Sequence, residues 1–342
     1  MIGNTLKSKQ ITCLKPQPTR EVRLGIYGGF TLVELVLVLM ILAIMASAAV
    51  SMVHTQVDQV KFEQSQQTLN DIEYAVLGSD HARAADGSKA VSGFVADCGR
   101  LPYLLENLYL RPTNIPEFGS QAPAGDSEVT VTGGWNGPYL QLALGASSLP
   151  DGWASTLAAH ESNGDVSSTT DPLSIVRSLG RDQAVGGTNY DKDLSVVFEA
   201  DADAVTSGLA MQAENRWQKS LTVYVYYSDS STDPEVANGE KIVIRVYGPV
   251  ADPTTGDVTL GTIQQEIVEY TSETSVSKTF SELPIGPRII RAYQLDEAPD
   301  PEDDLLATNS GEPGETLEAV SVQTRVVVSR ETSSIQLILK DI

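Results

Sequence analysis

The feature that most constrains this chain is a run of 48 residues, Phe30–Leu77, that contains neither glycine nor proline. Because these two residues are the strongest helix breakers, the run predicts one uninterrupted helix, about 72 Å long at 1.5 Å per residue. Its first half, Phe30–Val53, is apolar at all but four of its 24 positions. This exceeds the roughly 20 residues needed to cross a bilayer. We expect a single membrane span, with the helix ending at Gly78.

The second half of this helix has a different pattern. Val57, Val60, Leu69, Ile72 and Val76 recur at intervals of three, four or their multiples, with polar residues between them. Such spacing places apolar side chains along one face of a helix. We therefore expect this half to pack on a folded domain.

Charge is distributed unevenly along the chain. The 342 residues carry 23 Lys and Arg against 45 Asp and Glu, a net charge of −22. Residues 1–29 hold five of the cations and one acid, so the rest of the chain is strongly acidic. A basic head before an apolar span predicts that the head stays inside and the body is exported. The acidic body also argues against nucleic acid as a partner, because binding phosphates requires clustered cations.

The two cysteines are Cys13 and Cys98. If the basic head is removed, Cys98 alone is left and no intrachain disulfide can form. An exported body must then be held by its core or by another device such as a metal ion. We expect Cys98 itself to be a small buried apolar residue.

A short motif stands at the start of the apolar run. Gly29, Phe30 and Glu34 occur in the sequence Gly-Phe-Thr-Leu-Val-Glu, directly before the unbroken apolar stretch. This motif resembles the leader of type IV pilins and type II secretion pseudopilins. The resemblance implies that a prepilin peptidase cleaves after Gly29 and methylates the new amine of Phe30. It also implies that Glu34 pairs with the N-terminal amine of a neighbouring subunit during assembly.

The position of Glu34 agrees with that role on physical grounds. A carboxylate within hydrocarbon costs several kcal/mol and usually marks a function with a nearby partner. The amine of another chain would supply the partner and would set the stagger between helices. The alternative is that Glu34 lies at the membrane interface and reaches water.

The segment after Gly78 predicts a compact α+β head. Leu104, Leu105 and Leu108 indicate a short helix after Pro102, and the segments Gly133–Leu140 and Leu149–Leu157 contribute aromatic residues. These two segments are similar to the head of major pseudopilins. The likeness is partial, because this chain has Asp151-Gly152-Trp153-Ala154 where the family has a proline.

An acidic loop within Ser178–Ala200 is the main candidate for chemistry. Asp182, Asp191 and Asp193 flank the Gly186–Gly187 turn. Oxygen-rich loops with turn glycines suit Ca²⁺, which takes six to eight oxygen ligands. The alternative is a solvated acidic loop.

This loop also resembles the calcium loop of major pseudopilins. By that resemblance, Asp191 and Asp193 match the paired aspartate ligands, Asp182 matches the earlier one, and Leu179 offers a backbone carbonyl. The implied cofactor is Ca²⁺.

From about residue 215 the chain consists of short β-branched and aromatic runs. Ser220–Asp229 and Glu240–Val250 are the clearest, and alternating runs follow to the C-terminus, separated in one place by the acidic segment Asp296–Glu315. Short strands at regular spacing predict an all-β sandwich.

The predicted fold class is therefore α+β, with a long N-terminal helix packed on a pilin-like head and followed by a β-sandwich. The domains are the leader 1–29, the helix 30–78 that spans the membrane to about residue 53, the head 79–200 and the β module 201–342.

Catalysis is not indicated. His54, His81 and His160 form no metal-binding pair, and no nucleophile motif is present. We expect a structural subunit of a pseudopilus or type IV pilus-like filament, and not an enzyme. Its location would be the bacterial inner membrane, with the body in the periplasm or in an extracellular filament. Its partners would be the prepilin peptidase, copies of itself and other pilins, the inner-membrane assembly platform and membrane lipid. The alternatives are a minor pilin or adhesin that displays the β-sandwich for binding, and an anchored periplasmic enzyme.

Overall fold

The computed structural model describes ten stretches of the chain, which are residues 31–79, 91–123, 126–161, 171–199, 215–227, 241–269, 275–295, 317–321, 323–329 and 333–341. The chain divides into two compact units, Met1–His54 and Thr55–Ile342. Each unit is described by itself below.

Helix α1 spans Leu32–Leu77, which confirms the uninterrupted helix. It ends where Gly78 takes a φ of 76°, a left-handed conformation that glycine adopts without strain. The Gly78 N–H closes the last turn on the Tyr74 carbonyl at 2.8 Å. A side chain here is also excluded by space, since a Cβ would lie 2.4 Å from the Ser92 carbonyl oxygen.

Within the second unit, α1 buries one face against the head. Leu69, Ile72 and Val76 are buried, as the spacing predicted. Val57 and Val60 are 45% and 62% exposed, so the prediction that they pack on the head is wrong. The helix face that is covered at this level carries Asp58, Phe62 and Ser65 instead.

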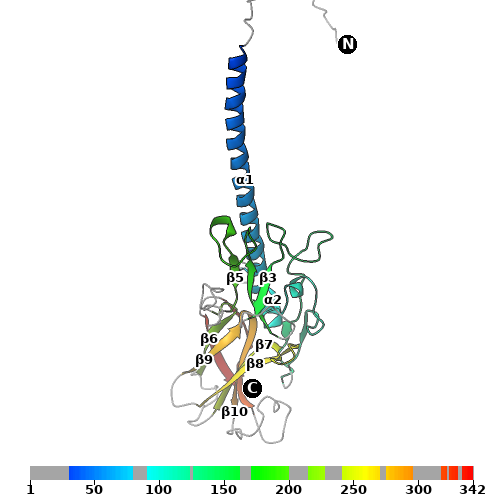
Figure 1. Ribbon diagram of the computed structural model, residues 1–342. Coiled ribbons are helices and arrows are strands. Elements are labelled where there is room, and N and C mark those ends of the chain that lie inside the picture. Colours follow the sequence, from blue (N-terminus) through cyan, green and yellow to red (C-terminus); the bar gives the residue numbers. More distant parts are fainter. Residues whose placement is uncertain are drawn as a thin grey trace, which may run out of the picture. The chain divides into compact units, whose positions relative to one another are not determined.

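The head consists of short elements packed around the second half of α1. It contains helix α2 (Phe94–Cys98) and two 3₁₀ helices, η1 (Leu105–Leu108) and η2 (Asn189–Asp191). Strands β1 (Gly119–Gln121) and β2 (Val131–Gly133) form one antiparallel pair, and β3 (Ala158–Glu161), β4 (Leu173–Ser178) and β5 (Leu194–Val197) form a three-stranded antiparallel sheet. Figure 1 shows β3 and β5 beside α1. The short helix predicted after Pro102 is confirmed by η1.

The head core includes Cys98, which is free and fully buried. This confirms the expectation of a small buried apolar residue. Burial raises the pKa of the Cys98 thiol to about 12, so it stays protonated and unreactive at neutral pH.

The C-terminal strands form an eight-stranded sheet within the described residues. The strands are β6 (Gln218–Tyr227), β7 (Lys241–Ala251), β8 (Val258–Glu269), β9 (Ser275–Pro284), β10 (Gly286–Leu295), β11 (Leu317–Ser321), β12 (Thr324–Val328) and β13 (Ser333–Asp341). Their order is β8-β7-β10-β11-β13-β6-β9, with β12 paired to β10. The β6–β13 pair is parallel, and the remaining pairs are antiparallel. The segment Asp296–Glu315 lies outside the described residues.

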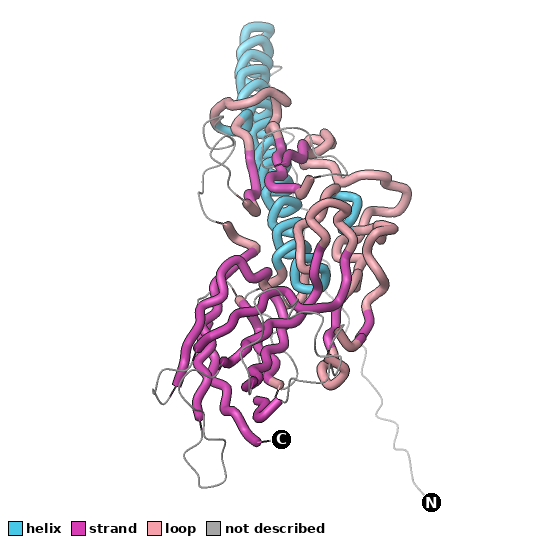
Figure 2. Tube along the Cα trace, turned by 90° about the horizontal axis from the view of Figure 1, so that it is seen from below, coloured by secondary structure: helices cyan, strands magenta, loops and turns pink. Residues whose placement is uncertain are grey.

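Inward residues of this sheet form one core, and its strands lie together in the magenta part of the body (Figure 2). Val223 and Val225 of β6 share a cluster with Ile242, Ile244 and other inward residues of β7, although these strands are far apart in the sheet order. The edge strands β8 and β9 are joined by side chains, with Lys278 paired to Glu266 at 2.8 Å and Gln264 donating to the Ser281 carbonyl. The α+β class is thus confirmed. The two layers of the predicted β-sandwich are the two halves of one continuous sheet.

The head and the β body share buried contacts where α2 meets β7 and β10. Gly99 and Gly286 allow the backbones to approach, since a Cβ at either would lie within 2.6 Å of a backbone atom of Pro249 or Ala96. Arg288 is buried between them and donates to the carbonyls of Ala96, Ile285 and Pro287 at 2.9–3.2 Å. The predicted boundary at residues 200 and 201 lies outside the described residues, so the division into a head and a β module stays a prediction.

A second buried polar cluster ties the loop before β2 to the β body. Asp126 accepts from the Tyr247 hydroxyl at 2.8 Å and from Arg291 Nη1 at 3.2 Å, and it also contacts Tyr293. All four side chains are buried. Removing one member of such a buried charge pair is strongly destabilising, because the other charge is left without a partner.

Asp97 on α2 is the buried acid whose charge is disfavoured. Its Oδ2 accepts from the Tyr139 hydroxyl at 3.1 Å. Burial raises the pKa of Asp97 from the ordinary value of 3.8 to about 6, and the Tyr139 and Asn136 hydrogen bonds and the Arg288 charge only partly oppose this. The folded protein therefore holds a proton on Asp97 between about pH 4 and 6, where the unfolded chain has lost it.

This difference predicts a pH-dependent penalty. Because the folded pKa is raised, Asp97 costs stability as pH rises from about 4 to 6, by about 2–3 kcal/mol at most. Asp97→Asn keeps an acceptor for Tyr139 and should escape that penalty. Denaturant unfolding of both proteins across this range should show the variant gaining on the parent as pH rises. Parallel pH profiles would contradict the assignment.

Candidate assembly helix and the loop bound to it

The motif residues lie at the start of α1. Gly29 and Phe30, the predicted cleavage site, are outside the described residues. Glu34 is in the first turn of α1 with its side chain exposed, and its backbone N–H contacts Thr31 Oγ1 at 3.2 Å. An acid in the first turn of a helix is favoured by the helix dipole. Its carboxylate is thus available to a group outside this chain.

The first half of α1 presents apolar side chains on every face. From Leu32 to Val53 the large apolar residues are 44–79% exposed. The helix contains a window apolar and long enough to span a membrane, and none of that window is buried within the chain. A surface of this size must be covered by lipid or by other helices.

The acidic loop Ser178–Asp193 lies on the second half of α1. Arg181 connects the two. Its Nε and Nη2 donate to Asp191 Oδ1 and Oδ2 at 2.8 and 3.0 Å, and its Nη1 donates to Asp58 Oδ2 of the helix at 2.9 Å. These hydrogen bonds, first those to Asp191 and then that to Asp58, raise the pKa of the guanidinium above its ordinary value.

Aromatic rings extend this contact one turn along the helix. Phe62 packs edge-to-face on Tyr190 of the loop, with ring centres 6.0 Å apart, and on Trp153 at 6.3 Å. Next along the helix, Ser65 Oγ accepts the Gly152 N–H at 2.9 Å. Gly152 is required at this point, because a Cβ would lie 1.9 Å from the Lys61 carbonyl oxygen.

Asp151 organises the segment that carries Gly152 and Trp153. It is buried, its Oδ1 accepts the N–H groups of Trp153 and Ser155, and its Oδ2 accepts the Ser178 hydroxyl at 2.8 Å. The segment 151–155 and the start of the acidic loop are therefore fixed to each other as well as to α1.

The other two predicted calcium ligands are also hydrogen-bonded within the protein. Asp193 Oδ2 pairs with Arg177 Nη1 at 3.3 Å and accepts the Gly186 N–H at 3.1 Å. Asp182 Oδ1 accepts the N–H of Ala184, two residues along, in a local turn. Leu179, whose carbonyl is the remaining predicted ligand, directly follows β4 and is half-buried.

These residues do not fit a calcium site in this arrangement. In the described part of the chain, no three His, Cys, Asp or Glu side chains are placed to share a metal ion. Asp191 and Asp193 each face an arginine, which supplies the positive charge that a metal would supply. Calcium binding by Asp182, Asp191, Asp193 and Leu179 stays a prediction.

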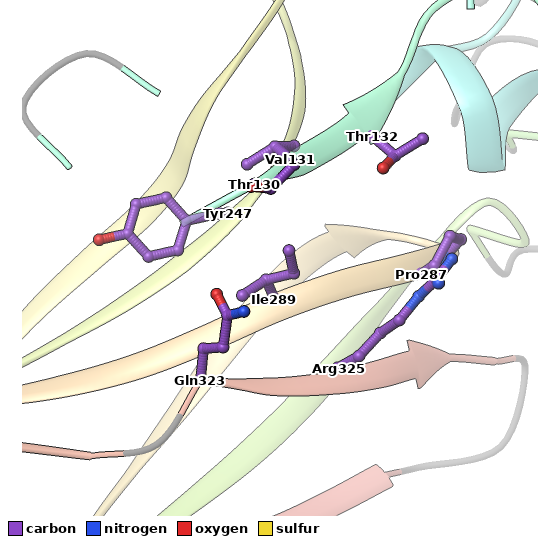
Figure 3. Close-up of a pocket in the computed structure, with 8 residues that line it drawn as sticks. All are labelled: Thr130, Val131, Thr132, Tyr247, Pro287, Ile289, Gln323 and Arg325. Atoms are coloured by element: carbon purple, nitrogen blue, oxygen red, sulfur yellow. The ribbon is translucent and has the colours of Figure 1, made fainter. Parts of the chain in front are cut away.

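A small cavity lies between the Thr130–Thr132 segment and strands β10 and β12 (Figure 3). Its volume is about 220 Å³, and Tyr247, Pro287, Ile289, Gln323 and Arg325 complete its lining. Sites for small molecules usually occupy about 300–1,000 Å³. This cavity suits a few waters or a single side chain.

The outer face of the β6–β9–β13 part of the sheet carries no charge over three rows of cross-strand neighbours. In register these are Ser334, Thr222 and Thr279; Gln336, Tyr224 and Ser277; and Ile338, Tyr226 and Ser275. Tyr224 and Tyr226 are half-buried, and Ile338 is exposed. We call these nine residues the uncharged face. It is unusual in a protein with 45 acidic residues.

Comparison with known proteins agrees with the N-terminal motif. The model of the prokaryotic N-terminal methylation motif matches residues 27–50. Together with the long apolar helix, this match supports a type IV pilin or pseudopilin family. The motif implies processing by a prepilin peptidase and assembly with other pilins.

The other comparisons add little. No curated protein matches the chain. Among solved structures, a leucine-rich repeat protein from Bacteroides thetaiotaomicron aligns at 8% identity and a TM-score of 0.21, over 53% of this chain and 24% of its own length. Two structures of the shaft pilin SpaA from Lactobacillus rhamnosus GG align at 10% identity and TM-scores of 0.18, over 50% and 64% of this chain and 66% and 73% of theirs. This chain therefore spans less than two thirds of the first two proteins, and the likeness to pilins rests on the motif.

Sequence reasoning missed the arginines of the acidic loop. Arg177 and Arg181 stand four residues apart and precede in the chain the aspartates that they bind, Asp193 and Asp191. Two cations close in sequence to three acids favour internal ion pairs. The acids alone favour a metal site, so the two interpretations compete.

Proposed function

We propose that this chain is a structural subunit of a type II secretion pseudopilus or a type IV pilus-like filament. It would be inserted in the bacterial inner membrane, processed by the prepilin peptidase, and assembled through α1 at an inner-membrane platform. Its body would lie in the periplasm or in an extracellular filament. The observation that carries the proposal is the methylation motif directly before a helix whose apolar surface is uncovered within the chain.

The energetic basis would be burial of this helix against other copies. At about 25 cal/mol per Å² of apolar surface, covering even part of Leu32–Val53 supplies a large driving force once the helix leaves lipid. Lipid covers the same surface before assembly, so burial alone does not set the axial register between neighbouring helices. A specific pairing must set it. A carboxylate at Glu34 facing the amine of a neighbouring chain would supply it.

The exposed face of α1 continues this surface beyond the apolar segment. Val57 and Val60 are exposed while the opposite face of the helix is docked on the head, and Tyr74 is 54% exposed near the end of the helix. These residues would contact neighbouring helices in a filament. This explains why two valines of the predicted stripe are not used within the chain.

The proposal predicts the effect of removing the charge of Glu34. Glu34→Gln keeps the size and hydrogen-bonding atoms of the side chain but removes the partner for an amine. Membrane insertion should be unchanged, and filament yield should fall at least about tenfold, because an ion pair at low dielectric is lost. Electron microscopy of sheared filaments, with immunoblots of the membrane fraction, measures both.

The matched control is Glu63→Gln, an exposed acid further along the same helix that accepts a hydrogen bond from Gln59. It should assemble like the parent. Normal filaments from the Glu34 variant would refute the assembly role of that residue.

A second candidate function is favoured by the uncharged face. Tyrosine, serine and threonine side chains give a surface that can bind another protein with little loss of side-chain entropy. The chain would then be a minor pilin or an adhesin-type subunit that displays its β body to a partner.

Photo-crosslinking tests this second function. A benzoylphenylalanine at position 226, in place of Tyr226, should yield a covalent adduct with a different protein in living cells. The same probe at the exposed Ser148 is the control and should yield none. Adducts made only with other copies would assign the face to filament contacts, and no adduct would contradict the display function.

A further inference from the structure

We propose that the guanidinium of Arg181 takes the place of a bound divalent cation and fixes the acidic loop Ser178–Asp193 to helix α1. The loop is the one in which the sequence predicts calcium ligands. The inference concerns how this chain stabilises that loop, and it does not depend on which filament the chain enters.

The first argument is that Arg181 joins two carboxylates that belong to different elements. Asp191 is at the end of η2 and Asp58 is on α1, 133 positions apart in the chain. All three guanidinium nitrogens are used, with distances of 2.8, 2.9 and 3.0 Å to carboxylate oxygens. A bidentate contact to one carboxylate and a single contact to another is a fixed geometry that the planar arginine fork favours.

The second argument is that the fork occupies the space a cation would need. Asp191 presents both carboxylate oxygens to Arg181, so neither points to a shared position with Asp193, which faces Arg177. Calcium would have to displace Arg181 to recruit Asp191. One guanidinium between two carboxylates performs the same electrostatic task as a cation, at a lower total charge.

The third argument is that the loop glycines are explained without a metal. Gly187 has a φ of 87°, and a Cβ there would lie 2.2 Å from the Asp191 carbonyl oxygen. The Arg181 N–H donates to the Tyr190 carbonyl at 2.9 Å, and the Asp193 N–H donates to the Gly186 carbonyl at 3.2 Å. The glycines thus allow the loop backbone to close on itself, and Arg181 then holds the closed loop on the helix.

The two stabilisers respond differently to solution conditions. Arg181 is about half exposed, with 48% of its side chain accessible, so salt screens its ion pairs. A chelator has no effect on such a bridge. A calcium site would show the reverse, with loss of the loop in chelator and little response to sodium chloride.

Hydrogen exchange of the loop amides tests the proposal. The full chain is purified in detergent, and deuterium uptake of the peptide that contains Gly186–Asp193 is followed by mass spectrometry in excess calcium chloride, in EDTA and at rising sodium chloride. We expect identical uptake in calcium and EDTA. In Arg181→Gln and in Asp58→Asn, uptake should be about 3- to 10-fold faster, and the double variant should be no faster than Arg181→Gln alone.

Arg111→Gln is the matched control, because Arg111 is an exposed arginine that is also paired with one acid, Glu117, in another loop. It should leave uptake of the acidic loop unchanged. Peptides from β7 and β10 report in every variant that the fold is intact.

Two results would overturn the proposal. One is slower uptake of the loop in calcium than in EDTA in the parent protein, which would mean that a metal binds there. The other is unchanged uptake in Arg181→Gln with intact β7 and β10 peptides, which would mean that the bridge holds nothing.

Discussion

The whole structure depends on one helix having to satisfy two environments. Between its end turns, the backbone N–H and C=O groups of α1 are hydrogen-bonded inside the helix, which is the condition for passing through hydrocarbon. Among the described residues, its first half exposes apolar side chains on all sides, while the head covers one face of its second half.

The attachment of the body to this helix changes in character along its length. Near Leu77 it is apolar, with Leu69, Ile72 and Val76 in the head core. Towards the membrane half it becomes polar and aromatic, through Ser65, Phe62 and Asp58. The head in turn is joined to the β body by buried groups, Arg288 at α2 and Asp126 at the loop before β2. Force applied to the helix would therefore reach the β body through a continuous series of packed contacts.

Much of this fold follows from local sequence signals. The absence of helix breakers predicted the bounds of α1 to within two residues, and β-branched runs predicted strands β6 and β7. The order of the strands in the sheet did not follow, because it depends on the parallel β6–β13 pairing between segments about 110 residues apart. The prediction that Val57 and Val60 pack on the head is wrong. The docked face there contains Asp58 and Ser65, and the spacing of apolar residues does not reveal polar contacts. The calcium prediction for the acidic loop used its aspartates alone. The arginines that bind these aspartates determine the structure of the loop.

The most direct test of the account is the mass of the N-terminal peptide of the membrane-extracted chain, made in cells that contain the prepilin peptidase. The account predicts a chain that begins at N-methylated Phe30, with the basic leader removed. That result leaves α1 as an assembly helix in a mature chain whose fifth residue is Glu34. A chain that keeps Met1, or one cut after the apolar run, would contradict the filament function and leave an anchored or secreted β protein.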